Sequence, residues 1–269
     1  MLLTAKLYGK LAGSGRPTIQ NQKSKNQNLK LDARLAKKVA LSCRILAKLG
    51  LFKETTGHVS ARSDGQAMLI RGRGKEESGL LFTKPRDIVR ADFDGRNLGK
   101  STGLKTPNES GIHGELYRTR SDVGGIVHAH PSSIVLTSIA GIELRPIFGG
   151  YDPRAMRLAL RPIPVYPSSL TLHSKDQVRE MMNVMGDSDI CILRGHGVVV
   201  CGKSVEEATI QAIKLDALAQ LNLQAANLKN VAPISEEDQK SFRNRRGKGD
   251  GSAEPLWRYY VEWVKRVRA

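Results

Sequence analysis

Two histidines with one residue between them, His128 and His130, lie at the end of a short apolar segment that begins at Gly125. Pro131 follows directly. Such a run is typical of a strand that ends in a turn. Side chains two apart on a strand leave the same face, so both imidazoles can converge on one point, as a divalent metal requires of nitrogen ligands. A third histidine, His196, follows a second apolar segment and is flanked by glycines. The sequence therefore predicts a metal site with three nitrogen ligands.

Glu109 is the carboxylate that best completes this site. It lies in the first turn of a helix expected to begin at Pro107 and Asn108, with His113 one turn further along the same face. A carboxylate that binds the metal and can leave it gives a catalytic site its open position. The alternative, that Glu109 only complements the helix N-terminus, stays open. His113 is interpreted as a supporting or core histidine and not as a ligand.

The composition limits the class of protein. At 269 residues and 40% hydrophobic, the chain can bury a core as one large domain or two small ones. Three widely spaced cysteines without a Cys-x-x-Cys indicate buried thiols in a reducing compartment. The chain has no run of 18 or more apolar residues, and its start lacks a sustained hydrophobic stretch. We therefore expect a cytoplasmic protein without a membrane span or a secretory signal.

The charge favours an anionic partner, because the formal net charge is +17 and the pI is near 10.0. The densest basic clusters lie at residues 71–75 and 243–248. Nucleic-acid binding would need aromatic side chains beside such clusters, and only 5% of the chain is aromatic. We expect solvated basic loops and a small anionic substrate, and we expect no nucleic-acid partner.

The chain divides into three parts. Residues 1–30 are basic and poor in apolar side chains and are predicted to be a disordered extension. Residues 31–230 are predicted to form the folded domain, and residues 231–269 a basic linker and an aromatic C-terminal helix. This aromatic tail is too apolar to stay exposed, so we expect it at or near a subunit interface.

Periodicity and turn residues predict the elements of the folded domain. Helices are expected at 31–49, 107–117, 131–140, 175–185 and 204–228, and strands at 57–61, 67–70, 80–83, 88–93, 189–193 and 197–201, besides the strand that carries His128. Residues 141–167 are expected to be a Gly/Pro-rich crossing. The strands and helices do not alternate strictly, so a mostly antiparallel sheet covered by helices is expected.

Four segments together resemble the class II aldolase/adducin family. They are residues 56–62, 109–117, 127–131 and 196–208, which occur in the family's order within residues 31 to 228. The resemblance implies a three-layer α/β/α sandwich around an antiparallel sheet, and a cyclic homotetramer with active sites between subunits. It also implies a divalent metal, zinc above manganese or cobalt.

Residue by residue, the resemblance places the metal ligands at His128, His130 and His196. Glu109 falls on the family's carboxylate, which coordinates the metal at rest and then acts as acid/base. Tyr151 lies near the position of a tyrosine proton donor of related aldolases, one residue out of register.

Two motifs depart from those of the sugar-phosphate aldolases of this family. Those enzymes carry asparagine in the first motif and serines before the catalytic carboxylate, and these groups bind phosphate. Here the corresponding residues are His58 and the pair Pro107-Asn108. We therefore expect a non-phosphorylated carboxylate, bound by His58, Asn108 and Arg71. Arg71 and its neighbour Arg73 are expected on a flexible loop.

These features predict a metal-dependent carbon–carbon lyase. Residues 80–95 and the aromatic tail resemble the family branch that contains decarboxylases of hydroxylated aromatic or pyridine carboxylic acids. The first choice is therefore decarboxylation of a small hydroxy aromatic acid. Retro-aldol cleavage of a hydroxy-carbonyl or sugar-phosphate substrate is the alternative, and a non-enzymatic adducin-like interaction module is a further one. Retention of all the ligand residues argues against the module.

Residues 197–204 satisfy the phosphate-loop pattern G-x-x-x-x-G-K-[ST]. A phosphate loop needs an irregular backbone with converging amides. Val198, Val199 and Val200 are instead three stiff β-branched residues that favour a strand. We therefore predict a strand at these residues and no nucleotide site.

Overall fold

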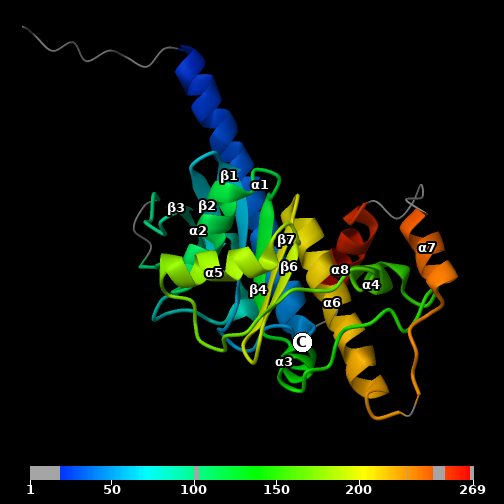
Figure 1. Ribbon diagram of the computed structural model, residues 1–269. Helices are drawn as coiled ribbons and strands as arrows, with labels where there is room; N and C mark the ends of the chain where they lie inside the picture. Colours follow the sequence, from blue (N-terminus) through cyan, green and yellow to red (C-terminus); the bar gives the residue numbers. More distant parts are fainter. Residues whose placement is uncertain (1–18, 100–102, 229, 245–251, 267–269) are drawn as a thin grey trace, which may run out of the picture.

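The protein is a sheet with helices on both faces, seen in a computed structural model that describes residues 19–99, 103–228, 230–244 and 252–266 (Figure 1). The helices are α1 Ile19–Lys48, α2 Ser110–Thr119, α3 Ser132–Ile139, α4 Pro153–Leu158, α5 Lys175–Met185, α6 Val205–Ala225, α7 Glu236–Asn244 and α8 Glu254–Arg266. The strands are β1 His58–Asp64, β2 Ala67–Arg71, β3 Ile88–Asp92, β4 Gly125–Ala129, β5 Val165–Tyr166, β6 Ile190–Leu193 and β7 Gly197–Gly202. Two 3-10 helices span Leu80–Phe82 and Pro85–Asp87.

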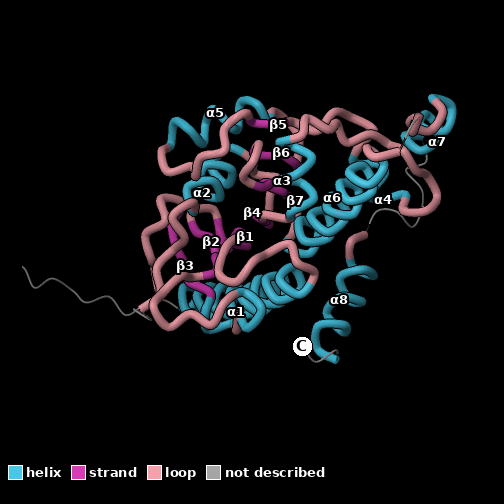
Figure 2. The backbone as a smooth tube through the Cα atoms, turned by 90° about the horizontal axis from the view of Figure 1, so that it is seen from below, coloured by secondary structure: helices cyan, strands magenta, loops and turns pink. Residues whose placement is uncertain are grey.

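The seven strands form one sheet in the order β3-β2-β1-β4-β7-β6-β5. All neighbours pair antiparallel except β5 and β6, which are parallel. Helices α1 and α6 pack on one face and α2 and α5 on the other, as Figure 2 shows. The predicted three-layer sandwich around a mostly antiparallel sheet is confirmed.

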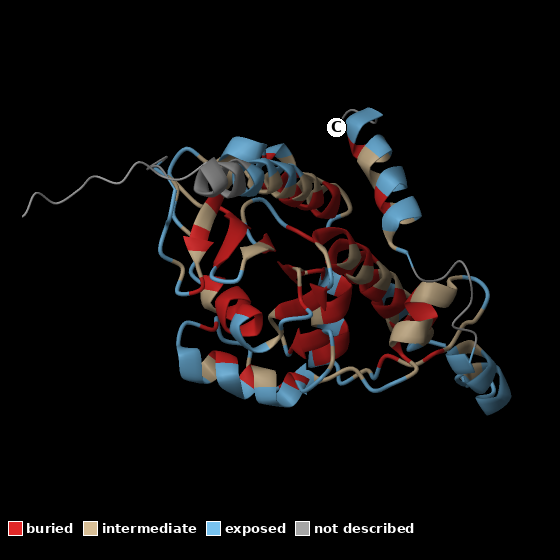
Figure 3. Ribbon diagram, turned by 90° about the horizontal axis from the view of Figure 1, so that it is seen from above, coloured by how far each residue is buried: buried red, intermediate tan, exposed pale blue. Residues whose placement is uncertain are grey.

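Side chains of the central strands alternate between two cores, as the period of two requires. On β1, Val59 and Ala61 enter the core under α1 and α6. The alternate residues His58 and Ser60 are buried as well, and they hydrogen-bond side chains of α2 on the other face. Figure 3 shows this burial concentrated in the sheet and the inner sides of the helices. Polar side chains on a buried face are the structural basis of the site described below.

The valine run Val198–Val200 lies within β7, so the predicted strand is confirmed where the phosphate-loop pattern matched. All three valines are buried. The following helix α6 begins as expected, because the Ser204 hydroxyl accepts a hydrogen bond from the Glu207 N–H. It ends at Ala225, three residues before the predicted end.

Several element predictions are wrong in extent or kind. Helix α1 begins at Ile19, so residues 19–30 are helical and the expected disordered extension is too long; residues 1–18 lie outside the described residues. The apolar run 80–83 contains a 3-10 turn in place of a strand. The crossing 141–167 contains α4 and β5.

The aromatic C-terminal segment forms helix α8, as predicted, and packs against α1 and α6 of its own chain. Trp257 is buried in the core shared by these helices, whereas Tyr259 remains exposed. The tail therefore buries part of its apolar surface within the chain, and its place at a subunit interface stays a prediction. None of the described helices is long and apolar enough to span a membrane.

Candidate metal centre

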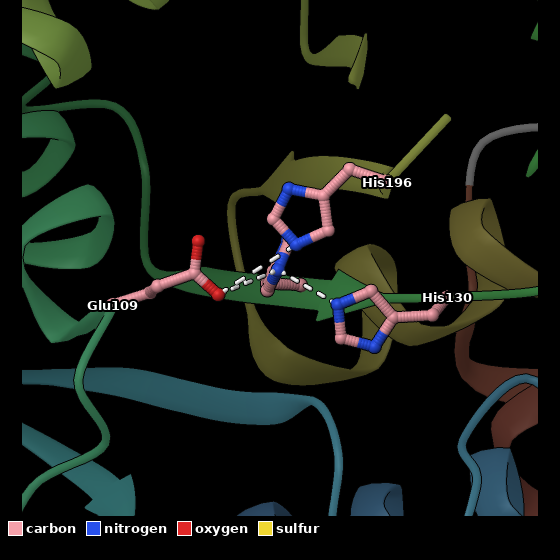
Figure 4. A group of neighbouring side chains, drawn as sticks. Glu109, His130 and His196 are labelled. Carbon is pink, nitrogen blue, oxygen red and sulfur yellow. Dashed lines mark hydrogen bonds and ion pairs between the residues drawn. The ribbon is translucent and has the colours of Figure 1, made fainter. Parts of the chain in front are cut away.

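Four side chains from separate elements meet at one end of the central strands. His128 lies on β4 and His130 directly after it, His196 lies in the turn between β6 and β7, and Glu109 precedes α2 as its N-cap residue. One possible ligand atom from each lies within 4.8 Å of the others. Figure 4 shows Glu109, His130 and His196 converging from different sides. The sequence prediction brought together the same four residues.

The spacing of the ligand atoms fits a divalent ion. The Nε2 atoms of His128 and His130 are 3.1 Å apart. Glu109 Oε2 lies 3.5 Å from His128 Nε2 and 3.7 Å from His196 Nε2. Nitrogen ligands at roughly 2.0–2.1 Å from a tetrahedral ion are separated by about 3.3 Å. These three separations are close to that value, so three imidazoles and one carboxylate could hold a divalent ion here.

A cross-strand contact fixes the orientation of His128. Its Nδ1 lies 3.1 Å from the backbone oxygen of Val198 on the neighbouring strand β7. Because a carbonyl can only accept, Nδ1 carries the proton and Nε2 keeps its lone pair for a metal. Gly197 allows this close approach, since a Cβ there would lie 2.3 Å from the Ala129 oxygen and 2.7 Å from a carbon of the His130 ring.

Burial keeps the His130 and His196 imidazoles in the neutral form that binds metals. It is the largest cause that lowers the pKa of His130 to about 3, and the neighbouring His128 and His196 rings add to it. Burial also lowers the pKa of His196, although Glu109 opposes this change. Neutral nitrogen ligands at neutral pH are what a three-histidine site requires.

Glu109 is ionised in this setting. Burial raises the Glu109 pKa, whereas the neighbouring His128 ring and the hydrogen bond from the Leu172 backbone lower it, and the net result is a pKa of about 2. The Leu172 N–H donates to Oε1 at 2.8 Å, while Oε2 faces the histidines. Glu109 thus offers a carboxylate oxygen to the group of possible ligand atoms, besides placing a negative charge at the helix end.

The site opens into a cavity of about 1090 Å³. His58, His130, His196 and Glu109 lie at its inner end. The rest of the lining comes from four segments, residues 56–57, 73–77, 103–108 and the pair Thr171 and His173. Most of these residues are charged or polar. A cavity of this size can hold a small aromatic acid next to the ligand set.

The predicted substrate-binding residues have different positions. His58 and Asn108 line the cavity, as their proposed role requires. Arg71 does not: it ends β2, is only 2% exposed, and pairs with Glu77 in the wall of a second cavity. The prediction that Arg71 reaches substrate from a flexible loop is therefore wrong, because a strand and a buried ion pair hold it in place.

Arg73, two residues further, lines the main cavity in place of Arg71. Its Nε donates to Glu77 Oε1 at 2.8 Å, so Glu77 bridges both arginines. The sequence placed Arg73 with Arg71 on a flexible loop that could bind a substrate carboxylate. Lys105 and the backbone of Leu172 were not singled out as site residues.

Tyr151 lies in the turn before α4 and is 82% exposed. Its ring stands edge-on to Phe148, with centroids 5.9 Å apart, and it does not line the main cavity. Within one chain it is not placed to reach the metal centre. Its role as a proton donor stays a prediction that would need a neighbouring subunit.

The fold and the four possible ligand residues define an α/β protein with a candidate metal site. The chain matches the family described as Class II Aldolase and Adducin N-terminal domain over residues 37–223. This match covers well over half of the chain, and the chain belongs to that family.

Curated relatives share sequence across most of the same region. A 3,4-dihydroxyphthalate decarboxylase of Arthrobacter keyseri is 41% identical over 192 residues, which cover 70% of this chain and 77% of that protein. The protein of the same name from Terrabacter sp. is 40% identical over 190 residues, 70% of this chain and 80% of that protein. A 5-methylthioribulose-1-phosphate/5-deoxyribulose-1-phosphate aldolase of Rhodospirillum rubrum is 29% identical over 66% of this chain and 76% of that protein.

Solved structures share the fold. An aldolase II superfamily protein from Pseudomonas syringae superposes with a TM-score of 0.74 at 20% identity, covering 88% of this chain and 94% of that one. The L-fuculose 1-phosphate aldolase of Glaciozyma antarctica does so with a TM-score of 0.72 at 16% identity, covering 93% and 94%. At these identities the likeness shows the architecture alone.

Proposed function

We propose that this chain is a metal-dependent carboxy-lyase that removes a carboxylate from a hydroxylated aromatic acid resembling 3,4-dihydroxyphthalate. The observation that carries the proposal is the ligand set of three imidazoles and Glu109 at the inner end of the main cavity. Relatives at about 40% identity that are named for this decarboxylation support the substrate class.

The cavity suits an acid with more than one anionic group. Lys75 and Lys105 are exposed at its rim and make no ion pair with another described residue. Arg73 is held there by Glu77 and supplies a planar donor that can bind a carboxylate by two hydrogen bonds. These three cations outside the ligand set can bind the carboxylate that stays on the ring while the other one leaves.

A divalent ion held by His128, His130, His196 and Glu109 would act as a Lewis acid and stabilise the negative charge that remains when carbon dioxide departs. The ionised Glu109 accepts the proton of the substrate hydroxyl and returns it to the ring carbon from which the carbon–carbon bond has broken. The electron pair of that bond stays on the ring carbon until this proton arrives. The Leu172 N–H keeps the carboxylate directed at this position through Oε1.

We further propose zinc as the metal and a homotetramer as the assembly. Zinc prefers four-coordinate sites with imidazole and carboxylate ligands. Exposed apolar side chains lie close to the His196 turn: Ile139 is 51% exposed, and its Cγ2 is 3.3 Å from where a Gly195 Cβ would be. Leu136 and Leu170 are also exposed. A second subunit covering this surface would exclude water from the metal centre.

The test is an assay of carbon dioxide release from 3,4-dihydroxyphthalate by the full-length, zinc-loaded protein. L-fuculose 1-phosphate serves as the aldol substrate in parallel. Release of one carbon dioxide per substrate, without cleavage of the sugar phosphate, is the expected outcome. Cleavage of the sugar phosphate alone would replace the proposal with retro-aldol chemistry.

A further inference from the structure

Behind the cavity wall, four buried side chains form one continuous hydrogen-bonded row. His58 Nδ1 lies 2.7 Å from His113 Nε2, and His113 Nδ1 lies 2.6 Å from Ser60 Oγ. Ser60 Oγ lies 2.8 Å from the Tyr117 hydroxyl. All four residues are at most 3% exposed. None of the four belongs to the metal-ligand set, so the row needs its own explanation.

The row forms because the side-chain spacing on strand β1 matches the spacing on helix α2. His58 and Ser60 are two apart on β1 and therefore leave the same face of the sheet. His113 and Tyr117 are four apart on α2 and lie one turn above each other. Packing α2 on this face sets the helix pair against the strand pair, so the polar groups alternate along a single line.

The direction of donation in the row is fixed at its far end. The Tyr117 hydroxyl has one hydrogen-bond partner among the described residues, the Ser60 hydroxyl. A buried phenol that did not donate to Ser60 would leave its proton without an acceptor, which disfavours that arrangement by about tenfold or more. Tyr117 therefore donates to Ser60.

The remaining bonds follow from this first one. Ser60 uses its own proton toward His113 Nδ1, so the proton of neutral His113 is on Nε2. His113 Nε2–H then donates to His58 Nδ1, and the proton of neutral His58 is on its own Nε2. Both rings are almost completely buried, which favours their neutral form.

The Nε2 atom of His58 reaches the main cavity. His58 lines that cavity, and its Nδ1 is already used by His113. Nε2 makes no hydrogen bond with a described residue, and it is not completely buried. The His58 ring also lies next to the ligand His128, with centroids 5.0 Å apart. This N–H therefore stands beside the metal centre, directed at the space where substrate binds.

We propose that His58 is a specificity-determining residue whose Nε2–H donates to an anionic oxygen of the substrate, and that Tyr117, Ser60 and His113 are positioning residues that hold it in this tautomer. The identity of the substrate as an aromatic acid rests on the function proposed above. A fixed neutral donor binds a carboxylate or phenolate oxygen and cannot accept from a protonated hydroxyl. The direction of donation along the buried row thus determines which substrate oxygens His58 can bind.

The direct test is the tautomer of His58 in the full-length, zinc-loaded protein labelled with ¹⁵N-histidine. Long-range ¹H–¹⁵N spectra distinguish a protonated from an unprotonated ring nitrogen, and His58→Gln assigns the signals. We expect one His58 species with Nε2 protonated. In Ser60→Ala, which breaks the row, a second tautomer should appear. Ser63→Ala removes a hydroxyl of the same strand that bonds Asp32 instead, and should leave the spectrum unchanged. A wild-type His58 protonated on Nδ1, or unchanged tautomers in Ser60→Ala, would overturn the proposal.

Binding supplies a second test that needs no turnover. The probe is 3,4-dihydroxybenzoate, which keeps the catechol and one carboxylate of the substrate named for the relatives. His58→Leu should weaken its affinity about 10- to 100-fold, the effect of losing a hydrogen bond to a charged group. His58→Gln, which keeps an N–H of similar reach, should stay within about threefold of wild type. Equal affinities of the Leu and Gln variants, at equal zinc content, would overturn the donor role even if decarboxylation is confirmed.

Discussion

The backbone N–H of Leu172 donates to Oε1 of Glu109 at 2.8 Å, although the two residues are 63 positions apart. This contact leaves Oε2 free to face His128 and His196 at 3.5 and 3.7 Å. One oxygen thus anchors the carboxylate while the other joins the ligand set. The same side chain can therefore leave the metal and still remain within reach of the substrate.

Glu109→Gln tests the proton-transfer role. The amide keeps the shape of the side chain but cannot accept a proton, and such groups contribute about 10²- to 10⁴-fold to rate. We expect turnover of 3,4-dihydroxyphthalate to fall by that range while circular dichroism stays unchanged. The exposed Glu237 of α7 gives the matched control, Glu237→Gln. Near-normal turnover of Glu109→Gln would show that Glu109 does not transfer the proton.

Substitution of Arg71 should affect the stability of the protein, and substitution of Arg73 should affect substrate binding. Arg71→Gln removes the buried partner of Glu77 and should lower the free energy of unfolding by about 1–3 kcal/mol, because Glu77 keeps its ion pair with Arg73. Arg73→Gln should have a small effect on unfolding, because its side chain is 38% exposed, and should raise KM instead. Denaturant unfolding and steady-state kinetics measure the two quantities. A large KM effect confined to Arg71→Gln would reverse this assignment.

Acid should destabilise the metal-free protein through its buried histidines. Burial is the largest cause that lowers the His113 pKa from the usual 6.5 to about 3. Between these values the unfolded chain binds a proton that the folded chain does not, so stability is complete above about pH 6.5 and is lost as pH falls toward 3. We expect His113→Gln to reduce the slope of unfolding free energy against pH in this window. Parallel pH profiles of the variant and the wild type would contradict the neutral, buried state of His113.

Trp257 should attach α8 to the domain. Its side chain is 6% exposed within the core under α1 and α6, and removal of a buried tryptophan costs about 3–5 kcal/mol. Trp257→Ala should therefore lower the melting temperature clearly, whereas Tyr259→Ala, at a position 61% exposed, should not. If Tyr259→Ala alone changes the mass measured by light scattering, the exposed side of α8 takes part in assembly. Equal melting temperatures for the two variants would contradict the packing of α8.

The sequence predicted what local patterns determine. His128 and His130 could be assigned because a strand period of two sets their direction, and Val198–Val200 because three β-branched residues favour a strand over a phosphate loop. The contact of Leu172 with Glu109 could not be predicted, since it depends on how distant segments pack. Residues 19–30 were misjudged because polar residues can extend a helix that has already formed. Arg71 was misjudged because its charge suggested solvent, and only the position of Glu77 explains its burial.

The central claim is that His128, His130, His196 and Glu109 hold the ion on which decarboxylation depends. The most direct measurement is carbon dioxide release from 3,4-dihydroxyphthalate while zinc is titrated into chelator-treated protein. We predict activity that rises from background to a plateau at about one ion per chain, as in three-histidine catalytic sites. His173→Ala, which changes a cavity residue outside the ligand set, should keep this stoichiometry, and His128→Ala should not reach the plateau. Full activity in the metal-free protein, or an unchanged titration of His128→Ala, would contradict the account.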